Sequence, residues 1–307
     1  MVVKIGVLWD SEVEHDGVTP FGRDELDHTY QVFSEIAKEN NAEAYLANYL
    51  KYENGRLSES YNYSNGWKKK ENIDLDVVFD KYKFDEDTIE LKKEIQSNLK
   101  VINSFDLEKI CKDKLLTYER FPYRVPDTME ATRENVAKIL EDDKAILKPR
   151  YDFGGHGIEV IDSIEDFEPE EDLLVQRFVD SETGIDALNV AGVHDLRVLV
   201  LNGEPLGAYI RTPEEGYLSN VSLGGSMRFV DIDDIPDEAM EIVEEVSDKF
   251  DQYNPAYYSV DMIFDSDDKP WILEFNSKPG FNFYNDEEIE SKKRPIMAKL
   301  VETLAGM

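Results

Sequence analysis

Residues 258–276 read YSVDMIFDSDDKPWILEFN, in which two apolar segments flank a polar turn. If this stretch is an antiparallel hairpin centred on the Asp-Asp dipeptide of its turn, Asp261 lies directly opposite Glu274. Side chains two residues apart share a face of a strand, so Asn276 points the same way as Glu274. Two carboxylates and an amide oxygen are ligands that suit Mg²⁺ together with water and phosphate oxygens. The hairpin therefore predicts a magnesium site formed by Asp261, Glu274 and Asn276.

Acidic residues are so frequent in this chain that chance pairs of carboxylates must be common. Of 307 residues, 67 are Asp or Glu and 34 are Lys or Arg, which gives a formal net charge of -33. The apolar neighbours Val260, Met262 and Phe275 set the hairpin pair apart, because they indicate that its carboxylates project from a packed sheet.

The uniform negative charge also bears on partners and on location. It would repel phosphate backbones, which argues against nucleic acid as a partner. No apolar run approaches the ~20 residues of a membrane helix, so we expect no membrane. A salt-rich cytoplasm would screen the self-repulsion, and we interpret the chain as halophilic and cytoplasmic.

A glycine-rich turn beside a lysine is a candidate phosphate-binding element. Residues 145–160 predict a strand that ends near Lys148, a turn, and a second strand. Gly154, Gly155 and Gly157 allow close backbone approach and present N–H donors, and Lys148 supplies a point charge. This hairpin can fold over phosphates.

The first hundred residues alternate apolar strand patterns with amphipathic helix patterns. The predicted strands are residues 3–8, 44–48, 75–79 and 100–103, and the predicted helices are 24–38 and 88–97. Strands separated by helices indicate βαβ units and a mainly parallel, Rossmann-like sheet. The first strand is not followed by Gly-x-Gly-x-x-Gly, so a dinucleotide site is poorly supported.

Three further segments complete the predicted organisation. Residues 52–70 predict an extended loop or hairpin inserted in the first domain, either a solvated excursion or a substrate-facing loop. Residues 106–118 predict a helix that leads, past Pro122 and Pro126, into a second module. Residues 286–304 predict a helix that packs on the core or forms a dimer, so a homo-oligomer stays open.

From about Lys100 to Gly280, the order of these pieces resembles the ATP-grasp superfamily, in particular its branch of glutathione synthetases and RimK-like ribosomal-protein glutamate ligases. The matching motifs are Asp113-Lys-Leu-Leu-Thr, the glycine-rich turn, Leu174-Val-Gln-Arg-Phe-Val, Asp195-Leu-Arg-Val-Leu-Val and the metal hairpin. The resemblance implies an α/β chain, α+β in its C-terminal part, with an ATP-grasp fold preceded by a Rossmann-like pre-ATP-grasp domain. The implied domains are 1–105, the pre-ATP-grasp domain; 106–175, the central subdomain with the phosphate-binding loop; and 176–307, the C-terminal subdomain with the metal and substrate site.

The resemblance also implies roles for individual residues. Residues matching the family's ATP contacts are Lys114, Lys148, Gly154, Gly155, His156, Gly157, Gln176, Arg177, Phe178 and Asp195. The catalytic matches near the reacting phosphoryl group are Lys148, Arg197 and Arg211, and the Mg²⁺ matches are Asp261, Glu274 and Asn276. A turn with Asn220, Gly224 and Gly225 resembles a substrate-binding turn. Lys278 departs from the family pattern, which has a small hydroxyl residue before Pro-Gly, and it hints at an acidic substrate.

The activity that the resemblance implies is ATP-dependent carboxylate–amine ligation. An acid would be activated as an acyl phosphate and joined to an amine, with release of ADP and phosphate. The implied partners are small-molecule or peptide substrates that carry the carboxylate and the amine. Two alternatives stay open: a small-molecule kinase on the same fold, and a non-catalytic ATP-binding regulator, which the complete metal set disfavours.

Overall fold

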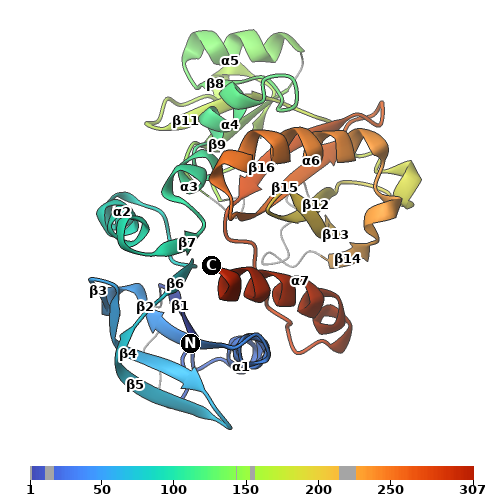
Figure 1. The fold of residues 1–307 in the computed structure, drawn as a ribbon. Coiled ribbons are helices and arrows are strands. Elements are labelled where there is room, and N and C mark those ends of the chain that lie inside the picture. The colour runs from blue at the N-terminus through green and yellow to red at the C-terminus, as the bar shows by residue number, and fades with distance from the viewer. Residues whose placement is uncertain (1, 11–16, 143, 153–155, 214–225) are drawn as a thin grey trace. The chain divides into compact units, whose positions relative to one another are not determined.

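A computed structural model describes residues 2–10, 17–142, 144–152, 156–213 and 226–307 of the protein. Contacts between residues divide the chain into two compact units (Figure 1). Unit 1 comprises Met1–Glu108, Tyr253–Tyr257 and Lys278–Met307, and unit 2 comprises Lys109–Gln252 and Tyr258–Ser277. This grouping places the C-terminal segment with the N-terminal unit, whereas the division into three domains remains a prediction.

Unit 1 is built on a sheet that has seven strands among the described residues, in the order β3-β4-β2-β1-β6-β7 with β5 paired to β4. Its strands are β1 Val3–Trp9, β2 Ala42–Asn48, β3 Tyr52–Glu53, β4 Arg56–Tyr63, β5 Trp67–Asp74, β6 Val77–Asp80 and β7 Lys100–Ile102. β1 pairs in parallel with β2 and β6, and β6 pairs in parallel with β7, which confirms the predicted parallel sheet. β4 and β5 form an antiparallel hairpin, so the hairpin prediction for this segment is also confirmed.

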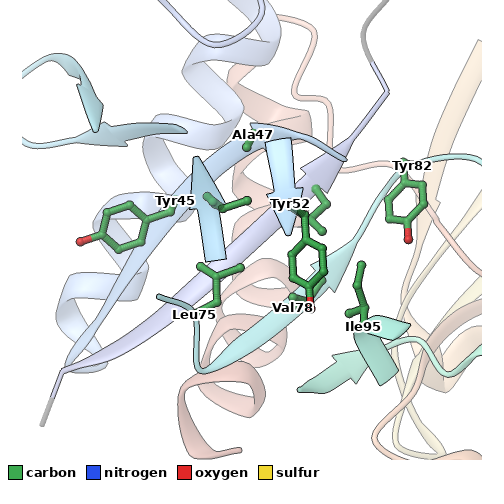
Figure 2. Packing of buried hydrophobic residues seen from close by; sticks show 9 residues of the cluster. Tyr45, Ala47, Tyr52, Leu75, Val78, Tyr82 and Ile95 are labelled. Carbon is green, nitrogen blue, oxygen red and sulfur yellow. The ribbon is translucent and has the colours of Figure 1, made fainter. Parts of the chain in front are cut away.

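Helices cover both faces of this sheet. Phe33 of α1 (Asp24–Glu39) stacks on Phe79 of β6, with ring centroids 6.1 Å apart. The adjacent Val78 belongs instead to a core cluster with Ile95 of α2 (Ile89–Asn98), as Figure 2 shows. Since successive side chains of a strand point to opposite faces, α1 and α2 cover opposite faces of the sheet.

The C-terminal helix α7 (Glu287–Gly306) completes unit 1. It contacts α1, β1 and β6, and its buried side chains include Met297 and Leu300. Asp286 caps the helix by accepting hydrogen bonds from the backbone N–H groups of Glu288 and Ile289. Of the two alternatives for this segment, packing on the core is the one observed.

Unit 2 contains two antiparallel sheets, in the orders β10-β9-β11-β8 and β14-β13-β12-β15-β16. The strands of the first are β8 Thr128–Glu130, β9 Ala145–Pro149, β10 Glu159–Ile161 and β11 Leu173–Arg177. The strands of the second are β12 Asp195–Leu201, β13 Glu204–Thr212, β14 Ser226–Val230, β15 Tyr257–Phe264 and β16 Pro270–Asn276. Its helices include α4 Lys114–Arg120, α5 Arg133–Ile139 and α6 Asp237–Phe250. Phe250 of α6 packs edge-on against Tyr258 of β15 and Phe275 of β16, which fixes the helix on the second sheet.

The single helix predicted over residues 106–118 is wrong, because the chain forms two helices there. α3 (Phe105–Lys112) ends before Asp113, and α4 begins at Lys114. The Asp113 carboxylate accepts hydrogen bonds from the N–H groups of Leu115 and Leu116, so it acts as the N-cap of α4. A residue that caps a helix has extended backbone angles, and this interrupts the predicted helix.

No helix among the described residues is both long and apolar enough to cross a membrane.

Candidate functional site

A cavity of about 140 Å³ in unit 2 is lined by side chains from both of its sheets. Its apolar wall consists of Ile146, Ile158, Val160, Phe178, Val179, Val193, Ile263 and Leu273. Its polar wall consists of Lys114, Lys148, Gln176, Ser181, His194, Asp195, Arg211, Asp261 and Glu274. The cavity thus brings together two lysines, three carboxylates and one arginine, with apolar side chains that suit the faces of a flat ring.

The hairpin β15–β16 places the two carboxylates that the sequence pairs. Asp261 is opposite Glu274, as predicted, and Asn276 is opposite Ser259. The pairs nearer the turn are centred on Asp267, and a bulge between Asp261 and Met262 restores the predicted pairing farther from the turn. The predicted pairing of Asp261 with Glu274 is therefore confirmed, although it depends on the bulge and not on one continuous register along the hairpin.

Asp261 is fully buried, and its carboxylate is surrounded by donors. Arg197 donates from Nε to Oδ1 at 2.7 Å and from Nη2 to Oδ2. Arg211 donates from Nη2 to Oδ2 at 2.9 Å, and the Ser259 hydroxyl donates to Oδ1 at 2.9 Å. Burial alone would raise the pKa of Asp261, but the two guanidinium groups outweigh it and hold the pKa below its ordinary value.

Arg211 joins a second carboxylate to this network. Its Nε donates to Asp195 Oδ1 at 2.7 Å, so Arg211 lies between Asp195 and Asp261. Burial raises the pKa of Asp195, and the nearby Asp261 adds to the rise, while Arg211 opposes it. The two arginines that resemble phosphoryl contacts are therefore held by carboxylates in this structure.

Glu274 has a different environment, although it lies opposite Asp261. Its Oε1 is 4.0 Å from Nη2 of Arg197, which is too long for a hydrogen bond. Burial raises the pKa of Glu274, and the negative charge of Asp261 raises it further. A half-buried carboxylate that lines the cavity in this way favours a cation beside it.

The two lysines of the cavity come from different elements. Lys148, on β9, is buried and donates from Nζ to Oε1 of Gln176 on β11 at 2.9 Å. Burial lowers the pKa of Lys148 to about 7, and the positive charge of Lys114 contributes to the decrease. Lys114, the first residue of α4, donates to the carbonyl oxygens of Pro149, at 3.1 Å, and Asp152.

The predicted phosphate loop follows β9, but Gly154 and Gly155 lie outside the described residues. His156 and Gly157 are described and exposed. Gly157 has φ +69, and a Cβ at this position would meet Cγ of Pro149 at 2.9 Å. Both the backbone angle and the close contact therefore require glycine at 157.

Of the three residues predicted for the adenine hinge, two line the cavity and one does not. Gln176 and Phe178 line the cavity. Gln176 also donates from Nε2 to Oγ1 of Thr128 at 2.7 Å, which fixes its amide oxygen toward Lys148. Arg177 is not among the cavity residues, because its guanidinium packs over the ring of Trp271, 4.6 Å from the centroid.

The sequence interpretation missed two buried residues of this site. His194 lines the cavity, its Nδ1 lies 3.0 Å from the Gly192 carbonyl oxygen, and its Nε2 accepts the N–H of Phe264 at 3.2 Å. Burial lowers the pKa of His194. The other residue is Ser259, whose partner Asp261 is two positions along the strand, a spacing that could have revealed it.

Lys278, which was predicted to contact the substrate, has partners within the protein. Within unit 1 its Nζ lies 3.1 Å from Asp80 and 3.0 Å from Glu108, and donates to the Tyr82 carbonyl oxygen at 2.5 Å. Lys92 contacts the same two carboxylates, so these side chains form a buried ion cluster. The other predicted substrate residues, Asn220, Gly224 and Gly225, lie outside the described residues.

The oxygen ligands near the cavity fit a divalent cation. Across the part of the chain that the structure describes, no three His, Cys, Asp or Glu side chains are grouped as a metal site, so a cation here would need the Asn276 amide as well. Glu274 lines the cavity, and hard oxygen ligands of this kind suit Mg²⁺. Asp261 fits only if one of its present donors gives way.

A family model described as the ATP-grasp domain matches residues 111–280, which is more than half of the chain. The chain belongs to the ATP-grasp domain family. The match covers the whole cavity, because every residue that lines it falls within this range.

Individual ATP-grasp proteins are similar to this chain in sequence or in fold. Glutamate–LysW ligase ArgX of Sulfolobus acidocaldarius is 27% identical over 194 residues, and the chain spans 65% of that relative's length and matches it over 59% of its own. A RimK-domain ATP-grasp protein of Sphaerobacter thermophilus superposes with a TM-score of 0.59 at 13% identity, covering 97% of this chain and 99% of the other. The ATP-grasp ligase PsnB, solved with a phosphomimetic variant of its minimal precursor, Mg and ADP, gives a TM-score of 0.59 at 14% identity and covers 98% and 99% of the two chains.

These similarities confirm the predicted α/β ATP-grasp fold. The residues predicted for the ATP-grasp site and found around one cavity are Lys114, Lys148, Gln176, Phe178, Asp195, Arg211, Asp261 and Glu274. Arg197 reaches the same site through its contact with Asp261.

Proposed function

We propose that this protein is an ATP-dependent carboxylate–amine ligase that works through an acyl phosphate. The observation that carries the proposal is the arrangement of Lys114 and Lys148 with Asp261 and Glu274 around one cavity of an ATP-grasp domain. Lysines neutralise phosphate oxygens, and carboxylates hold the cation that accompanies a nucleotide triphosphate. Within this arrangement, Lys114 and Lys148 supply the positive charge that a chain of net charge -33 needs where it binds the phosphates of ATP.

In the proposed reaction, a carboxylate oxygen of the acid attacks the γ-phosphorus of ATP, and ADP leaves. The amine nitrogen then attacks the acyl carbon, and phosphate leaves. Phosphoryl transfer of this kind depends on alignment and on neutralisation of charge, so no enzyme nucleophile is required.

Each part of the site has a proposed task. Lys114 and Lys148 bind phosphate oxygens, and the apolar wall together with Phe178 holds the adenine. Arg197 and Arg211 stabilise the negative charge that develops at the transferred phosphoryl group and the acyl carbon. Glu274, Asp261 and Asn276 would hold Mg²⁺, and the chemistry that bound Mg²⁺ supplies is charge neutralisation on the phosphates.

Two further parts of the site have proposed roles at its edges. The loop that contains Gly154, Gly155, His156 and Gly157 would close over the phosphates and exclude water from the acyl phosphate. Asp195 would contact the ribose.

The substrates are proposed as amino acids or peptides. Support comes from the names of the similar proteins, one a ligase of glutamate and LysW and another solved with a peptide precursor. A salt-rich cytoplasm is the proposed location, and its support is the acidic composition. A homo-oligomer is compatible with this proposal and is not required by it.

The test of the reaction is ADP release in the presence of an acid, an amine and ATP at high salt. A ligase needs all three together, and ¹⁸O from the acid carboxylate appears in inorganic phosphate. A stable phosphorylated product would identify a kinase instead, and nucleotide binding without turnover would identify a regulator.

Substitutions in the cavity test the assignment of residues. We expect Lys148→Ala and Glu274→Ala each to lower kcat/KM by about 10² or more, because Lys148 neutralises phosphate oxygens and Glu274 holds the cation that does the same. Glu244→Ala is the matched control, since Glu244 is exposed on α6. Near-normal turnover in either cavity variant, with a folded protein by circular dichroism, would reject the assignment.

A further inference from the structure

The acceptor sites of Asp261 are all in use. A carboxylate has two oxygens and about four lone-pair sites for hydrogen bonds. Oδ1 accepts from Nε of Arg197 and from the Ser259 hydroxyl, and Oδ2 accepts from Nη2 of Arg197 and Nη2 of Arg211. Because Asp261 is fully buried, water does not compete for these sites. A cation can therefore bind Asp261 only if one of the four donors leaves.

The four donors differ in how easily they leave. The three bonds from Arg197 and Arg211 are charge-assisted, and the bond pair from Arg197 is bidentate, which adds strength and geometric constraint. The Ser259 hydroxyl is neutral and makes one bond, at 2.9 Å. Its O–H rotates about a single bond, so it can turn away from Asp261 without a change in the backbone.

The position of Ser259 suits this exchange. It precedes Asp261 by two residues on β15 and therefore shares its face of the strand. It is fully buried, and it lies opposite Asn276, the third residue of the predicted metal set. The hydroxyl is thus located among the groups that a cation at Asp261 would contact.

We infer that Ser259 is a positioning residue that occupies one acceptor site of Asp261 in the cation-free protein and gives up that site to the divalent cation. The inference rests on the proposed function, since it concerns the cation of the same ATP site. In the cation-free protein the hydroxyl fixes the orientation of the carboxylate. In the cation-bound protein the hydroxyl has turned, and the freed lone pair of Oδ1 faces the cation.

This exchange predicts whether removing the hydroxyl strengthens or weakens cation binding. A hydrogen bond that exists only in the cation-free protein opposes cation binding by its own free energy. Removing the hydroxyl removes this opposition, so Ser259→Ala should bind the cation about tenfold more tightly. A variant that merely damaged the site would bind it more weakly.

The experiment is a titration with Mn²⁺ in the presence of a non-hydrolysable ATP analogue, in which free Mn²⁺ is measured by electron paramagnetic resonance. Wild type, Ser259→Ala and the control Ser247→Ala are compared. Ser247 lies on α6, and its hydroxyl is 3.2 Å from that of Tyr258, so the control also loses a hydroxyl contact but not at this site. We expect the Kd for Mn²⁺ to fall about tenfold in Ser259→Ala and to stay unchanged in Ser247→Ala.

A second variant covers the case in which Ser259→Ala does not fold. Ser259→Cys keeps a side chain of similar shape with a weak donor, and we expect its Kd for Mn²⁺ to fall as well. An unchanged or increased Kd in the folded Ser259 variants would overturn the inference while leaving the proposed function intact. Failure of the wild type to bind Mn²⁺ with the analogue would overturn both.

Discussion

The fold lowers the pKa of Lys148 so far that its amine titrates near neutral pH. It is buried, it neighbours Lys114, and its pKa is lowered to about 7. Phosphates bind the protonated amine, so the affinity for nucleotide depends on pH where this lysine titrates. Because the pKa is lowered, the charge is present below pH 7 and is lost as the pH rises above it.

We therefore expect the affinity for ADP to fall about tenfold per pH unit above pH 7, as one proton must be taken up on binding. Isothermal titration calorimetry between pH 7 and pH 9 measures this slope. Lys148→Arg is the matched variant, since a guanidinium keeps its charge over this range. If wild type and Lys148→Arg showed the same slope, Lys148 would not be the titrating group.

At the scale of residues, the sequence predicts which charged side chains belong to the site but not which side chains they contact. Lys148, Asp261 and Glu274 could be predicted because strand periodicity and a glycine-rich turn mark them. The partners of Lys278 could not, since Asp80 and Glu108 are about 200 and 170 residues away in the chain. His194 was missed for a similar reason, because its contact with Phe264 joins the residue before β12 to the end of β15, which only the fold brings together.

Among the elements, the break between α3 and α4 has the clearest effect on the site. Asp113 caps α4 and also forms a bidentate pair with Arg150, with distances of 2.8 and 2.7 Å. The N–H of Lys114 donates to the carbonyl oxygen of Arg150, so the start of α4 is fixed to the end of β9. The break is what places the side chain of Lys114 in the cavity.

We expect Asp113→Ala to lower the free energy of unfolding by about 2–3 kcal/mol, since it removes both the cap and the pair with Arg150. Asp113→Asn keeps a side chain that caps helices well, so its loss should be smaller, about 1 kcal/mol. Urea unfolding followed by circular dichroism measures both variants. Equal losses in the two variants would mean that capping contributes little here.

The elements themselves were largely predictable, and the exceptions have physical causes. Apolar strand patterns separated by helix patterns indicated the parallel sheet of β1, β2 and β6. Residues 52–70 were predicted as a loop or a hairpin, and the structure has the hairpin β4–β5 there. The bulge beside Asp261 leaves no trace in the pattern of apolar residues. Asp113 is a good capping residue, but it stands in a run that otherwise reads as one helix.

For the whole molecule, the net charge of -33 is the dominant electrostatic fact. Exposed charges repel one another over about 10 Å at 0.1 M salt and about 3 Å at 1 M. The ion cluster of Lys92, Lys278, Asp80 and Glu108 is buried, so salt screens it much less. Added salt therefore weakens the repulsion more than it weakens these attractive pairs.

We expect the Tm to rise by at least about 5 °C between 0.1 and 2 M KCl, because several kcal/mol of self-repulsion is screened. Differential scanning calorimetry measures this change. NaCl at equal concentration is the control, since screening depends on ionic strength and should give the same increase. A Tm that stayed constant or decreased would contradict the assignment of the charge to a salt-adapted surface.

Unit 1 is formed from chain segments that lie on both sides of unit 2 in the sequence, so it cannot be completed until unit 2 has been translated. β1 is translated long before α7, which packs on β1 and β6 and is formed by residues 287–306. Nearly all of unit 2 is synthesised between these two events. Unit 1 therefore acquires its full hydrophobic core only after unit 2 has been translated, and a nascent chain must keep an unfinished sheet from aggregating until α7 arrives.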